Sequence, residues 1–379
     1  MLPIEELICE TFYIEIHDWH PTDEPAGKCD RMITIAMLTE LESFSKYIPF
    51  QNPGGMGTIV PLWIRELEKL GCKVNLDDTE SDFDILHLHN PFPRSIGAAL
   101  KTRIIGKPVV VHGHHLPELV KGGFKGGAII YPLNKLYSRF FFSLGDVIIA
   151  PSPFAATSLQ SLGIKRPFKV IFNGVDRSRF KKDILVGKAF REKFGLPDDA
   201  FIVLSVGLRI PRKGVDTFIE TAAEYRKLHP SSKVKFVWVG GTETLLVDAM
   251  PDGNLPDNVL FTGYVPLDLL LSSYSAANVF FLPTRAESYG NVILEAASVG
   301  LPIVLRDIPA FEGWLSDGKD CIKGRNAEDF AKAIESIWKD DALRSTLRTG
   351  SEKLAQAHDI VNTAKKLYEV YSALMEGVR

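Results

Sequence analysis

Short apolar runs alternate along the chain with stretches that show helical spacing. The runs are apolar at consecutive positions and rich in Val and Ile, which is typical of strands that helices cover on both faces of a parallel sheet. The helical spacing is clearest in Thr58–Leu70, which stops at Gly71. We predict two successive sets of strands: first Met32–Met37, Asp84–His89, Pro108–His112, Val147–Ala150 and Lys169–Phe172, and then Phe201–Val206, Val234–Val239, Val259–Thr262, Val279–Leu282 and Pro302–Leu305.

Two sets of alternating strands and helices predict an α/β protein built from two doubly wound, Rossmann-like domains. The turn Asn173–Asp176, followed by a polar and basic run, is the expected connection between them. We place an N-terminal domain at residues 32–173, a C-terminal domain at 174–358 and a final helix at 359–379. Residues 1–31 precede the first strand and carry a net charge of −6, so we interpret them as an acidic extension.

The composition excludes several classes of protein. Of 379 residues, 45% are hydrophobic and 24% are charged, which is ordinary for a globular protein and unlike a disordered, collagen-like or disulfide-scaffold chain. No apolar run approaches the ~18 residues that a membrane span needs, and the acidic N-terminus lacks the basic start of a signal peptide. The four cysteines show no C-x-x-C spacing and indicate reduced thiols. We therefore expect a cytoplasmic protein.

The segment 94–145 is basic and aromatic. It holds eight Lys or Arg residues against the single acid Glu118. Positive charge concentrated on a nearly neutral protein indicates an anionic partner, and bases mixed with aromatic residues suit a segment that lies in a membrane interface. The alternative is a solvated basic face over a buried aromatic helix. Under the membrane interpretation, the contacts with the anionic surface come from Lys121, Lys125, Lys135 and Arg139.

The segment Glu287–Glu295 follows a predicted strand and contains Gly290, so it has the order of strand, loop and helix that presents backbone N–H groups to phosphate. A helix beginning near Asn291 aims the amides of Asn291 and Val292 at the ligand. Glu295 then sits about one turn into the helix, where its carboxylate can accept hydrogen bonds from hydroxyls such as those of a ribose. The alternative is an N-capping loop with two surface glutamates.

The loop Gly207–Gly214, directly after another predicted strand, carries the cations Arg209, Arg212 and Lys213. Three like charges repel one another unless they share an anion. A diphosphate fits, because Arg gives bidentate hydrogen bonds and Lys a point charge. The alternative is a solvated basic turn.

Five of the nine histidines fall at the ends of two predicted strands, in His87–His89 and His112–His115. One of them could orient a reacting sugar or carry a proton. Paired H-x-H spacings also suit zinc hydrolases, so a metal-dependent hydrolase is the alternative. We favour the first interpretation and expect no metal, because the remaining histidines are poorly placed to complete a site. The turn Gly54–Gly57, ahead of the first helix, would let a phosphate or sugar approach the backbone.

Together these segments resemble the family 4 glycosyltransferases, which have the GT-B fold of two facing Rossmann-like domains with a cleft between them. Four motifs occur in the family's order across residues 32–379. They are the Gly54–Gly57 loop, the strand-end histidine of His112–His115, the R-K-G loop at Arg212–Gly214 and the Glu-x7-Glu segment. In this family the final helix packs back on the N-terminal domain, which we expect here.

The resemblance implies a role for each of these residues. Arg212 and Lys213 would neutralise the departing nucleotide diphosphate without a metal, Glu287 would contact the donor sugar, Glu295 would bind the ribose, and His114 would be the functional histidine. The expected catalytic residues are thus His114, Glu287 and Lys213. The expected donor-binding set is Gly55, Arg209, Arg212, Lys213, Gly263, Tyr264, Val265, Glu287, Tyr289, Gly290, Asn291, Val292 and Glu295, in which Gly263–Val265 read the base.

One position departs from the family, because Leu208 stands where many members carry Arg, and Arg209 would substitute for it. This departure and the run Arg306–Trp314 resemble the subgroup that makes glycosyl-diacylglycerols at the cytoplasmic membrane surface. The resemblance implies a retaining transfer of a hexose from UDP-glucose or UDP-galactose to a lipid acceptor, with no metal, no cofactor and no nucleic-acid partner. The alternatives are a transferase with a soluble or polysaccharide acceptor and a catalytically silent binding module.

Overall fold

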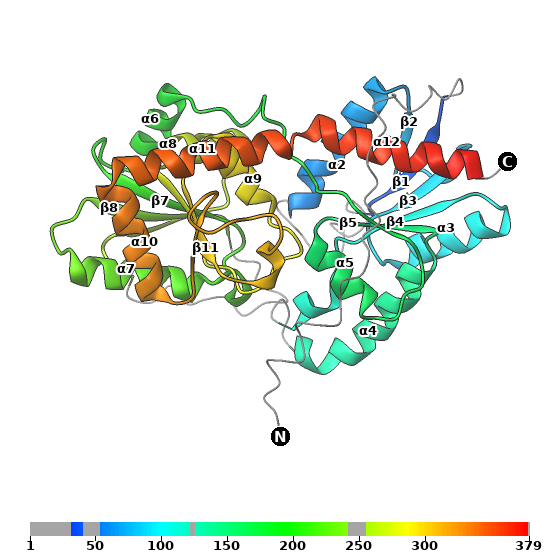
Figure 1. The fold of residues 1–379 in the computed structure, drawn as a ribbon, viewed down its shortest axis with the longest axis horizontal. Coiled ribbons are helices and arrows are strands. Elements are labelled where there is room, and N and C mark those ends of the chain that lie inside the picture. Colours follow the sequence, from blue (N-terminus) through cyan, green and yellow to red (C-terminus); the bar gives the residue numbers. More distant parts are fainter. Residues whose placement is uncertain (1–31, 41–53, 122–125, 242–254, 378–379) are drawn as a thin grey trace. The chain divides into compact units, whose positions relative to one another are not determined.

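The computed structural model describes residues 32–40, 54–121, 126–241 and 255–377. From Ile33 onward the chain forms one compact unit that contains two parallel six-stranded sheets (Figure 1). The first sheet has the strand order β2-β1-β3-β4-β5-β6. Its strands are β1 (Thr34–Leu38), β2 (Lys73–Leu76), β3 (Ile85–Leu88), β4 (Val109–His112), β5 (Val147–Ala150) and β6 (Phe168–Val170).

The second sheet has the strand order β12-β11-β10-β7-β8-β9. In both sheets the chain winds outward from a central strand in one direction and then in the other, as the doubly wound prediction requires. The order reverses between β1 and β3 and between β7 and β10, and ligands bind at such switch points. The strands are β7 (Phe201–Val206), β8 (Val234–Val239), β9 (Val259–Gly263), β10 (Val279–Leu282), β11 (Ile303–Arg306) and β12 (Ile322–Gly324).

Helices cover both faces of each sheet. Helices α2 and α12 bury apolar side chains on one face of the first sheet, and α3, α4 and α5 do so on the other. The second sheet has α6, α8 and α9 on one face and α7 and α10 on the other. The helices are α2 (Gly54–Lys69), α3 (Pro93–Ile104), α4 (Gly127–Ser143), α5 (Pro153–Gln160), α6 (Ile184–Lys193), α7 (Val215–Leu228), α8 (Leu267–Ala276), α9 (Asn291–Ser298), α10 (Ala327–Lys339), α11 (Asp341–Ala357) and α12 (Ile360–Gly377), with 3-10 turns η1 (Pro117–Val120), η2 (Pro211–Lys213) and η3 (Pro309–Phe311).

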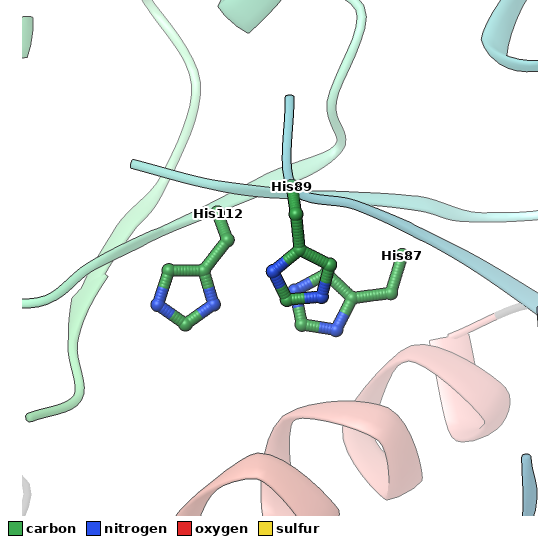
Figure 2. Close-up of side chains that lie close together, drawn as sticks. All are labelled: His87, His89 and His112. Carbon is green, nitrogen blue, oxygen red and sulfur yellow. The ribbon is translucent and has the colours of Figure 1, made fainter. Parts of the chain in front are cut away.

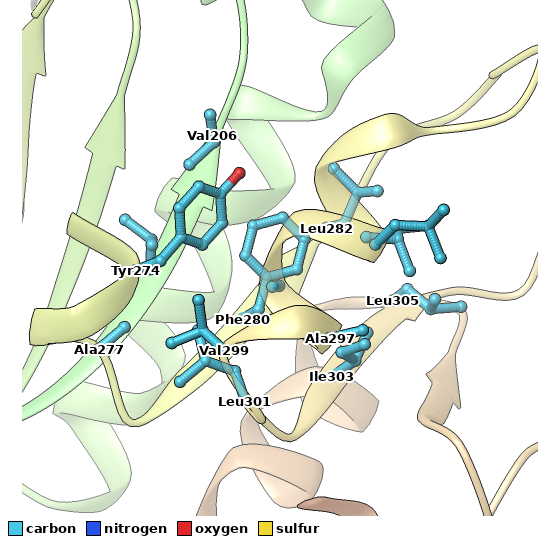
Figure 3. Close-up of a cluster of buried hydrophobic side chains, with 14 of the residues drawn as sticks. Val206, Tyr274, Ala277, Phe280, Leu282, Ala297, Val299, Leu301, Ile303 and Leu305 are labelled. Atoms are coloured by element: carbon cyan, nitrogen blue, oxygen red, sulfur yellow. The ribbon is translucent and has the colours of Figure 1, made fainter. Parts of the chain in front are cut away.

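The core beside the second sheet shows why the central strands are apolar throughout. Phe280 and Leu282 of β10 and Leu305 of β11 lie in the same buried cluster as Tyr274 and Val299 (Figure 3). Intervening residues such as Phe281 point to the opposite core under α7 and α10. Because both faces are covered, consecutive positions must be apolar, and each fully buried side chain of this size contributes roughly 1.5–3 kcal/mol to stability.

Each of the ten predicted strands has a counterpart: four have the predicted bounds, and the ends of the other six shift by at most two residues. The prediction missed β2 and β12, which are edge strands of the two sheets. Both are short, at four and three residues, and partly exposed, so they lack the continuous apolar run by which the other strands, including the edge strands β6 and β9, were predicted. In β2 the side chains of Lys73 and Leu76 are indeed exposed.

The first helix corrects one prediction about the glycine-rich turn. We expected Gly54–Gly57 to precede a helix that starts at Thr58, but helix α2 begins at Gly54. The N–H groups of a helix's first turn have no acceptor within the helix, which makes such a terminus a suitable place for an anionic ligand. If Gly55 contacts the donor as expected, the contact would come from the backbone N–H in the first turn of α2.

The chain returns to the first sheet at its end. The backbone N–H of Val175 donates to the His358 carbonyl, and the Ile360 N–H donates to the Val175 carbonyl, so the segment after β6 is tied to the start of α12. Helix α12 then buries Leu367 and Tyr371 in the core that contains α2. Within the described ranges, no helix combines the length and the apolar character that spanning a bilayer demands.

Candidate active site at the switch point of the second sheet

A buried cluster of opposite charges lies where the strand order of the second sheet reverses. The loop after β7 supplies Lys213, and the loop after β10 supplies Glu287, whose carboxylate Oε1 lies 2.6 Å from the Lys213 Nζ. Arg212 Nη1 lies 3.7 Å from Glu287 Oε2, and the Thr284 hydroxyl donates to Oε1 over 3.0 Å. The exposed fractions of the Lys213 and Glu287 side chains are 16% and 7%. A solvated basic turn and a surface glutamate are therefore both wrong descriptions here.

The charges of this cluster keep each other ionised despite burial. Burial would raise the pKa of Glu287, but the nearby charges of Lys213 and Arg212 and the hydrogen bonds from Lys213 and Thr284 outweigh it, so its pKa lies below the ordinary value. Burial and the Arg212 charge lower the pKa of Lys213 against the opposing effect of Glu287. The two cations exceed the single carboxylate, so the cluster carries a net positive charge that suits an anionic ligand.

Gly214 permits the close contact between the two loops. Its φ of +77° is in the left-handed region, and a Cβ placed on it would lie 2.2 Å from the carbonyl oxygen of Pro283. Any side chain at this position would therefore push the Lys213 loop away from the loop that carries Glu287. Arg212 also donates from Nη1 to the Ala286 carbonyl over 2.8 Å, which fixes the two loops together.

Glu295 lies one turn into α9, as predicted, and is held by a tyrosine. The Tyr274 hydroxyl of α8 donates to Glu295 Oε2 over 2.5 Å. Burial raises the pKa of Glu295, against the lowering effects of Tyr274 and of Arg179. Glu295 and Arg179 also line a small cavity with the side chains of Thr58, Ile59, Leu62, Leu267, Leu270 and Asn291. Helix α2 of the first sheet therefore lines the same cavity as the carboxylate that we expected to bind ribose.

The start of α9 has the expected glycine. Gly290 precedes the helix with a φ of +96°. The Asn291 Oδ1 accepts a hydrogen bond of 2.8 Å from Asn173, and the Ser288 carbonyl accepts one from Ser152, so residues preceding α9 and at its start contact the first half of the chain. Tyr289 packs its ring in the core, 1% exposed, so a donor contact at this residue would come from its backbone.

The ends of β7, β8 and β9 meet closely through glycines. The Gly240 N–H donates to the Gly263 carbonyl over 3.0 Å, and a Cβ on Gly240 would lie 2.0 Å from the Gly207 carbonyl oxygen. Arg209 lies with its guanidinium 4.0 Å from the centroid of the Phe261 ring. Its side chain thus contacts β9, the strand that leads to the predicted base-reading residues. Of these, Tyr264 and Val265 are half-buried.

The predicted functional histidine lies just beyond β4 in the first sheet. His114 is half-buried, its Nε2 lies 3.2 Å from the Nδ1 of His89, and its ring stacks on that of His112 at a centroid distance of 4.1 Å. Burial lowers the pKa of His114 to about 3, so its imidazole is neutral at physiological pH. Three other histidines of the predicted group, His87, His89 and His112, are core residues rather than surface ligands.

The predicted membrane segment centres on α4. Lys121 and Arg139 are exposed. Lys121 and Lys135 lie 3.9 and 5.7 Å from the centroid of the Tyr131 ring, and Lys125 lies outside the described residues.

Our prediction missed an apolar stripe on helix α4. Its members are exposed and spaced as one helical face: Ile129 (84% exposed), Leu133 (70%), Leu136 (65%) and Phe140 (48%). Their i, i+4, i+7, i+11 spacing is visible in the sequence. The alternative of a buried aromatic helix holds only for Phe141 and Phe142.

Sequence reasoning also missed Tyr274 and Thr284, the residues that hold the two glutamates. Neither belongs to a recognisable motif. Tyr274 is 21 positions from its partner and on another helix, and its hydroxyl carried no sequence signal. Thr284 lies three residues before Glu287, a spacing at which a hydroxyl can reach a carboxylate in a turn.

Known families and structures match both halves of the chain. The family model described as Glycosyltransferase Family 4 matches residues 76–179, and the model of the glycosyl transferases group 1 matches residues 187–354. A processive diacylglycerol alpha-glucosyltransferase of Acholeplasma laidlawii is 27% identical over 82% of this chain and 91% of its own length. An alpha-galactosylglucosyldiacylglycerol synthase of Streptococcus pneumoniae is 28% identical over 78% of this chain and 80% of its own.

Solved structures share the fold over nearly the whole chain. The Anabaena protein HepE in complex with UDP and glucose superposes with a TM-score of 0.70 at 17% identity, over 90% of this chain and 100% of its own. A sucrose-phosphate synthase from Thermosynechococcus elongatus gives 0.71 at 18% identity, over 91% and 100%. The predicted GT-B fold and the prediction of a hexosyltransferase are confirmed. Both halves of the chain thus match glycosyltransferase family models, and the chain is similar to the family 4 glycosyltransferases that make glycosyl-diacylglycerols.

Proposed function

We propose that this enzyme transfers a hexose from UDP-glucose or UDP-galactose to a diacylglycerol-type lipid, with retention of configuration and without a metal. The observation that carries the proposal is the buried cluster of Lys213, Arg212 and Glu287 at the switch point of the second sheet. Cleavage of the bond between the sugar and the diphosphate leaves negative charge on the diphosphate. Preorganised cations in a water-excluded site stabilise that charge, and such stabilisation is usually the largest catalytic contribution.

The donor would bind mainly to the second half of the chain. Arg212 and Lys213 would take the diphosphate, and the amides at the start of α9 would add donors to the same anion. Glu295, fixed by Tyr274, would accept hydrogen bonds from the ribose. Glu287 would contact the hexose, and the net positive charge of its cluster would draw in the anionic donor.

His114 would line the reacting centre from the first half of the chain. Its neutral imidazole can accept or donate a hydrogen bond but carries no charge that would compete with the diphosphate cations for an anion. The retaining outcome is supported by the names of the relatives, which are α-glycosyl transferases, because an α-linked nucleotide sugar that gives an α-linked product has kept its configuration.

The lipid acceptor is supported by the surface of α4. Its exposed face, Ile129, Leu133, Leu136 and Phe140, is apolar, and its charged side chains within Gly127–Ser143 are Lys135 and Arg139. An apolar stripe bordered by bases suits a helix that lies in the interface of an anionic membrane. We propose that the enzyme docks there as a peripheral protein and takes its acceptor from the bilayer.

Mass spectrometry of the products from a panel of nucleotide sugars tests the proposal. Each reaction contains either anionic vesicles with diacylglycerol or a soluble acceptor such as an inositol phosphate. A hexosylated lipid from one UDP-hexose is the expected product. A product made only from the soluble acceptor would favour the second function, a transferase with a soluble or polysaccharide acceptor.

A further inference from the structure

Three histidines from neighbouring strands meet in the core between the first sheet and the helices α2 and α12. His87 of β3, His89 just beyond it and His112 of β4 are 0%, 0% and 1% exposed, and their imidazoles lie close together (Figure 2). Each offers a ring nitrogen, and the three nitrogens all lie within 4.8 Å of one another. The H-x-H spacing puts His87 and His89 on one face of the strand, and β4 runs beside it.

Four ring nitrogens of this cluster have no hydrogen-bond partner among the described residues. Within the described part of the chain, His87 Nε2, His89 Nε2 and both ring nitrogens of His112 are buried and make no hydrogen bond. A neutral imidazole has one donor and one acceptor nitrogen, and each buried group left unsatisfied costs about 1–3 kcal/mol. Several such groups converge at one place, where a single ligand would satisfy them.

The opposite nitrogens of two of these rings have partners that suit metal ligands. His87 Nδ1 lies 2.7 Å from the Tyr371 hydroxyl, and His89 Nδ1 lies 3.2 Å from His114 Nε2. If each Nδ1 carries the proton and donates it to that partner, the Nε2 lone pair faces the cluster. Metal-binding histidines are oriented by this kind of outer hydrogen bond. Trp63 stacks on His112 at 4.9 Å and closes one side of the site.

We propose that His87, His89 and His112 bind a late first-row transition-metal cation such as Zn²⁺. Imidazole nitrogens favour such ions, whereas Mg²⁺ and Ca²⁺ require oxygen ligands that this group does not contain. Zn–N bonds of about 2.0–2.1 Å place the nitrogens of a tetrahedral site roughly 3.4 Å apart, so the rings must rotate inward on binding.

This site is separate from the diphosphate cluster. None of its ligands belongs to the loops of Lys213 and Glu287, so the proposal does not depend on the transfer reaction and leaves its metal independence intact. It does revise the expectation that the protein holds no metal at all. The ion would support the end of β4 that carries His114 and so stabilise the first half of the chain.

Zinc binding by the full-length protein tests the proposal. The parent protein carries C9S, H17Q, H20Q and C29S, because these residues of the acidic extension are alternative ligands. After chelation and dialysis, the parent is titrated with zinc, and bound metal and Tm are measured. We expect roughly one ion per chain and a Tm that rises with zinc concentration. Cobalt should give the visible d–d absorption of a nitrogen site without a thiolate charge-transfer band.

The matched variants are H89Q and H112Q, with H115Q as the control. His115 lies beside the cluster, but its Nε2 is already 3.2 Å from the Asn134 Oδ1. The first two should lose at least about tenfold in zinc affinity, and H115Q should keep it. Equal affinity in all variants, or no zinc on the parent, would overturn the proposal. If the variants do not fold by circular dichroism, the cobalt spectrum of the parent decides, and a silent spectrum overturns it.

Discussion

The Lys213 ammonium donates to the Glu287 carboxylate from a loop 74 positions away in the sequence, and both groups are shielded from water. The contact joins the ends of β7 and β10, the two strands between which the second sheet reverses its order. It therefore holds two loops at the place where an α/β sheet binds its ligand. When the donor enters, the Lys213 ammonium can exchange the Glu287 carboxylate for an oxygen of the diphosphate.

Replacing Lys213 with Ala should lower kcat by about 10²- to 10³-fold, because the diphosphate loses its point charge in the transition state. Lys332→Ala is the matched control, since Lys332 also lies 2.6 Å from a glutamate but its side chain is 64% exposed. Steady-state assays with the nucleotide-sugar donor, run beside the wild-type enzyme, measure kcat for both variants. A Lys213→Ala enzyme with near-normal kcat would refute the assigned role.

The same pair separates catalysis from folding. Lys213→Ala leaves the Glu287 carboxylate buried with Arg212 at 3.7 Å as its remaining cation, so unfolding free energy should fall by up to about 3–5 kcal/mol. Adding Glu287→Gln removes the uncompensated charge and should restore much of that stability without restoring turnover. Denaturant titrations of the single and double variants measure this. Recovery of activity together with stability would show that the pair is only structural.

Tyr274→Phe should weaken donor binding while leaving kcat at saturation nearly unchanged. The hydroxyl that fixes Glu295 is lost, which is worth about 1–1.5 kcal/mol and hence roughly a tenfold rise in KM for the nucleotide sugar. The hydrogen bond also lowers the pKa of Glu295. Without it the pKa rises further, so the loss of donor binding on acidification should begin at a higher pH.

The pH dependence of KM distinguishes this effect from a packing defect. Tyr225→Phe is the control, because Tyr225 is also a fully buried tyrosine of the second half but lies on α7. Its KM profile should follow the wild type. If Tyr274→Phe raises KM equally at all pH values, the hydroxyl positions Glu295 without affecting its protonation.

Acid should destabilise the fold through His358, between α11 and α12. Its Nδ1 lies 3.3 Å from the Tyr289 hydroxyl, and burial, with a smaller effect of Lys366, lowers its pKa to about 4. In the unfolded chain the His358 imidazole has a pKa near 6.5, so on acidification the unfolded state binds the proton before the folded state does. The free energy of unfolding therefore falls as pH drops from about 6.5 toward 4. His358→Asn should narrow the Tm difference between pH 7 and pH 5. If the Tm difference between pH 7 and pH 5 stays the same in this variant, protonation of His358 does not cause the loss of stability in acid.

Serine at Leu133 and Leu136 should abolish binding to anionic vesicles without loss of Tm, because both side chains are exposed on α4. Arg139→Ala should weaken binding by about 1 kcal/mol and reduce its salt dependence. Leu228→Ser, at an exposed leucine on α7, is the control. Co-sedimentation measures all three. Vesicle binding that survives the leucine variants would place the membrane contact on another surface.

The sequence predicted the central strands because their burial on two faces forces continuous apolar runs, as in β7 and β10. It did not predict β2 or β12, since an edge strand can be short and partly polar. The ligand-binding residues of a loop were predictable where they stand together in a short motif, as in Arg212–Gly214 and the segment that begins at Glu287. The Tyr274–Glu295 contact was not, because packing of α8 against α9 has no local signature. Nor was the burial of His87, which depends on cover from α12.

The most direct test of the central claim is hexose transfer to lipid by enzyme that has been treated with EDTA. The purified protein is incubated with UDP-glucose or UDP-galactose and vesicles of anionic lipid and diacylglycerol, and the lipids are examined by mass spectrometry. The account predicts that hexosyl-diacylglycerol forms in the presence of EDTA and that added Mg²⁺ or Mn²⁺ does not raise the rate. Transfer that stops with EDTA and returns with added Mg²⁺ or Mn²⁺ would contradict it.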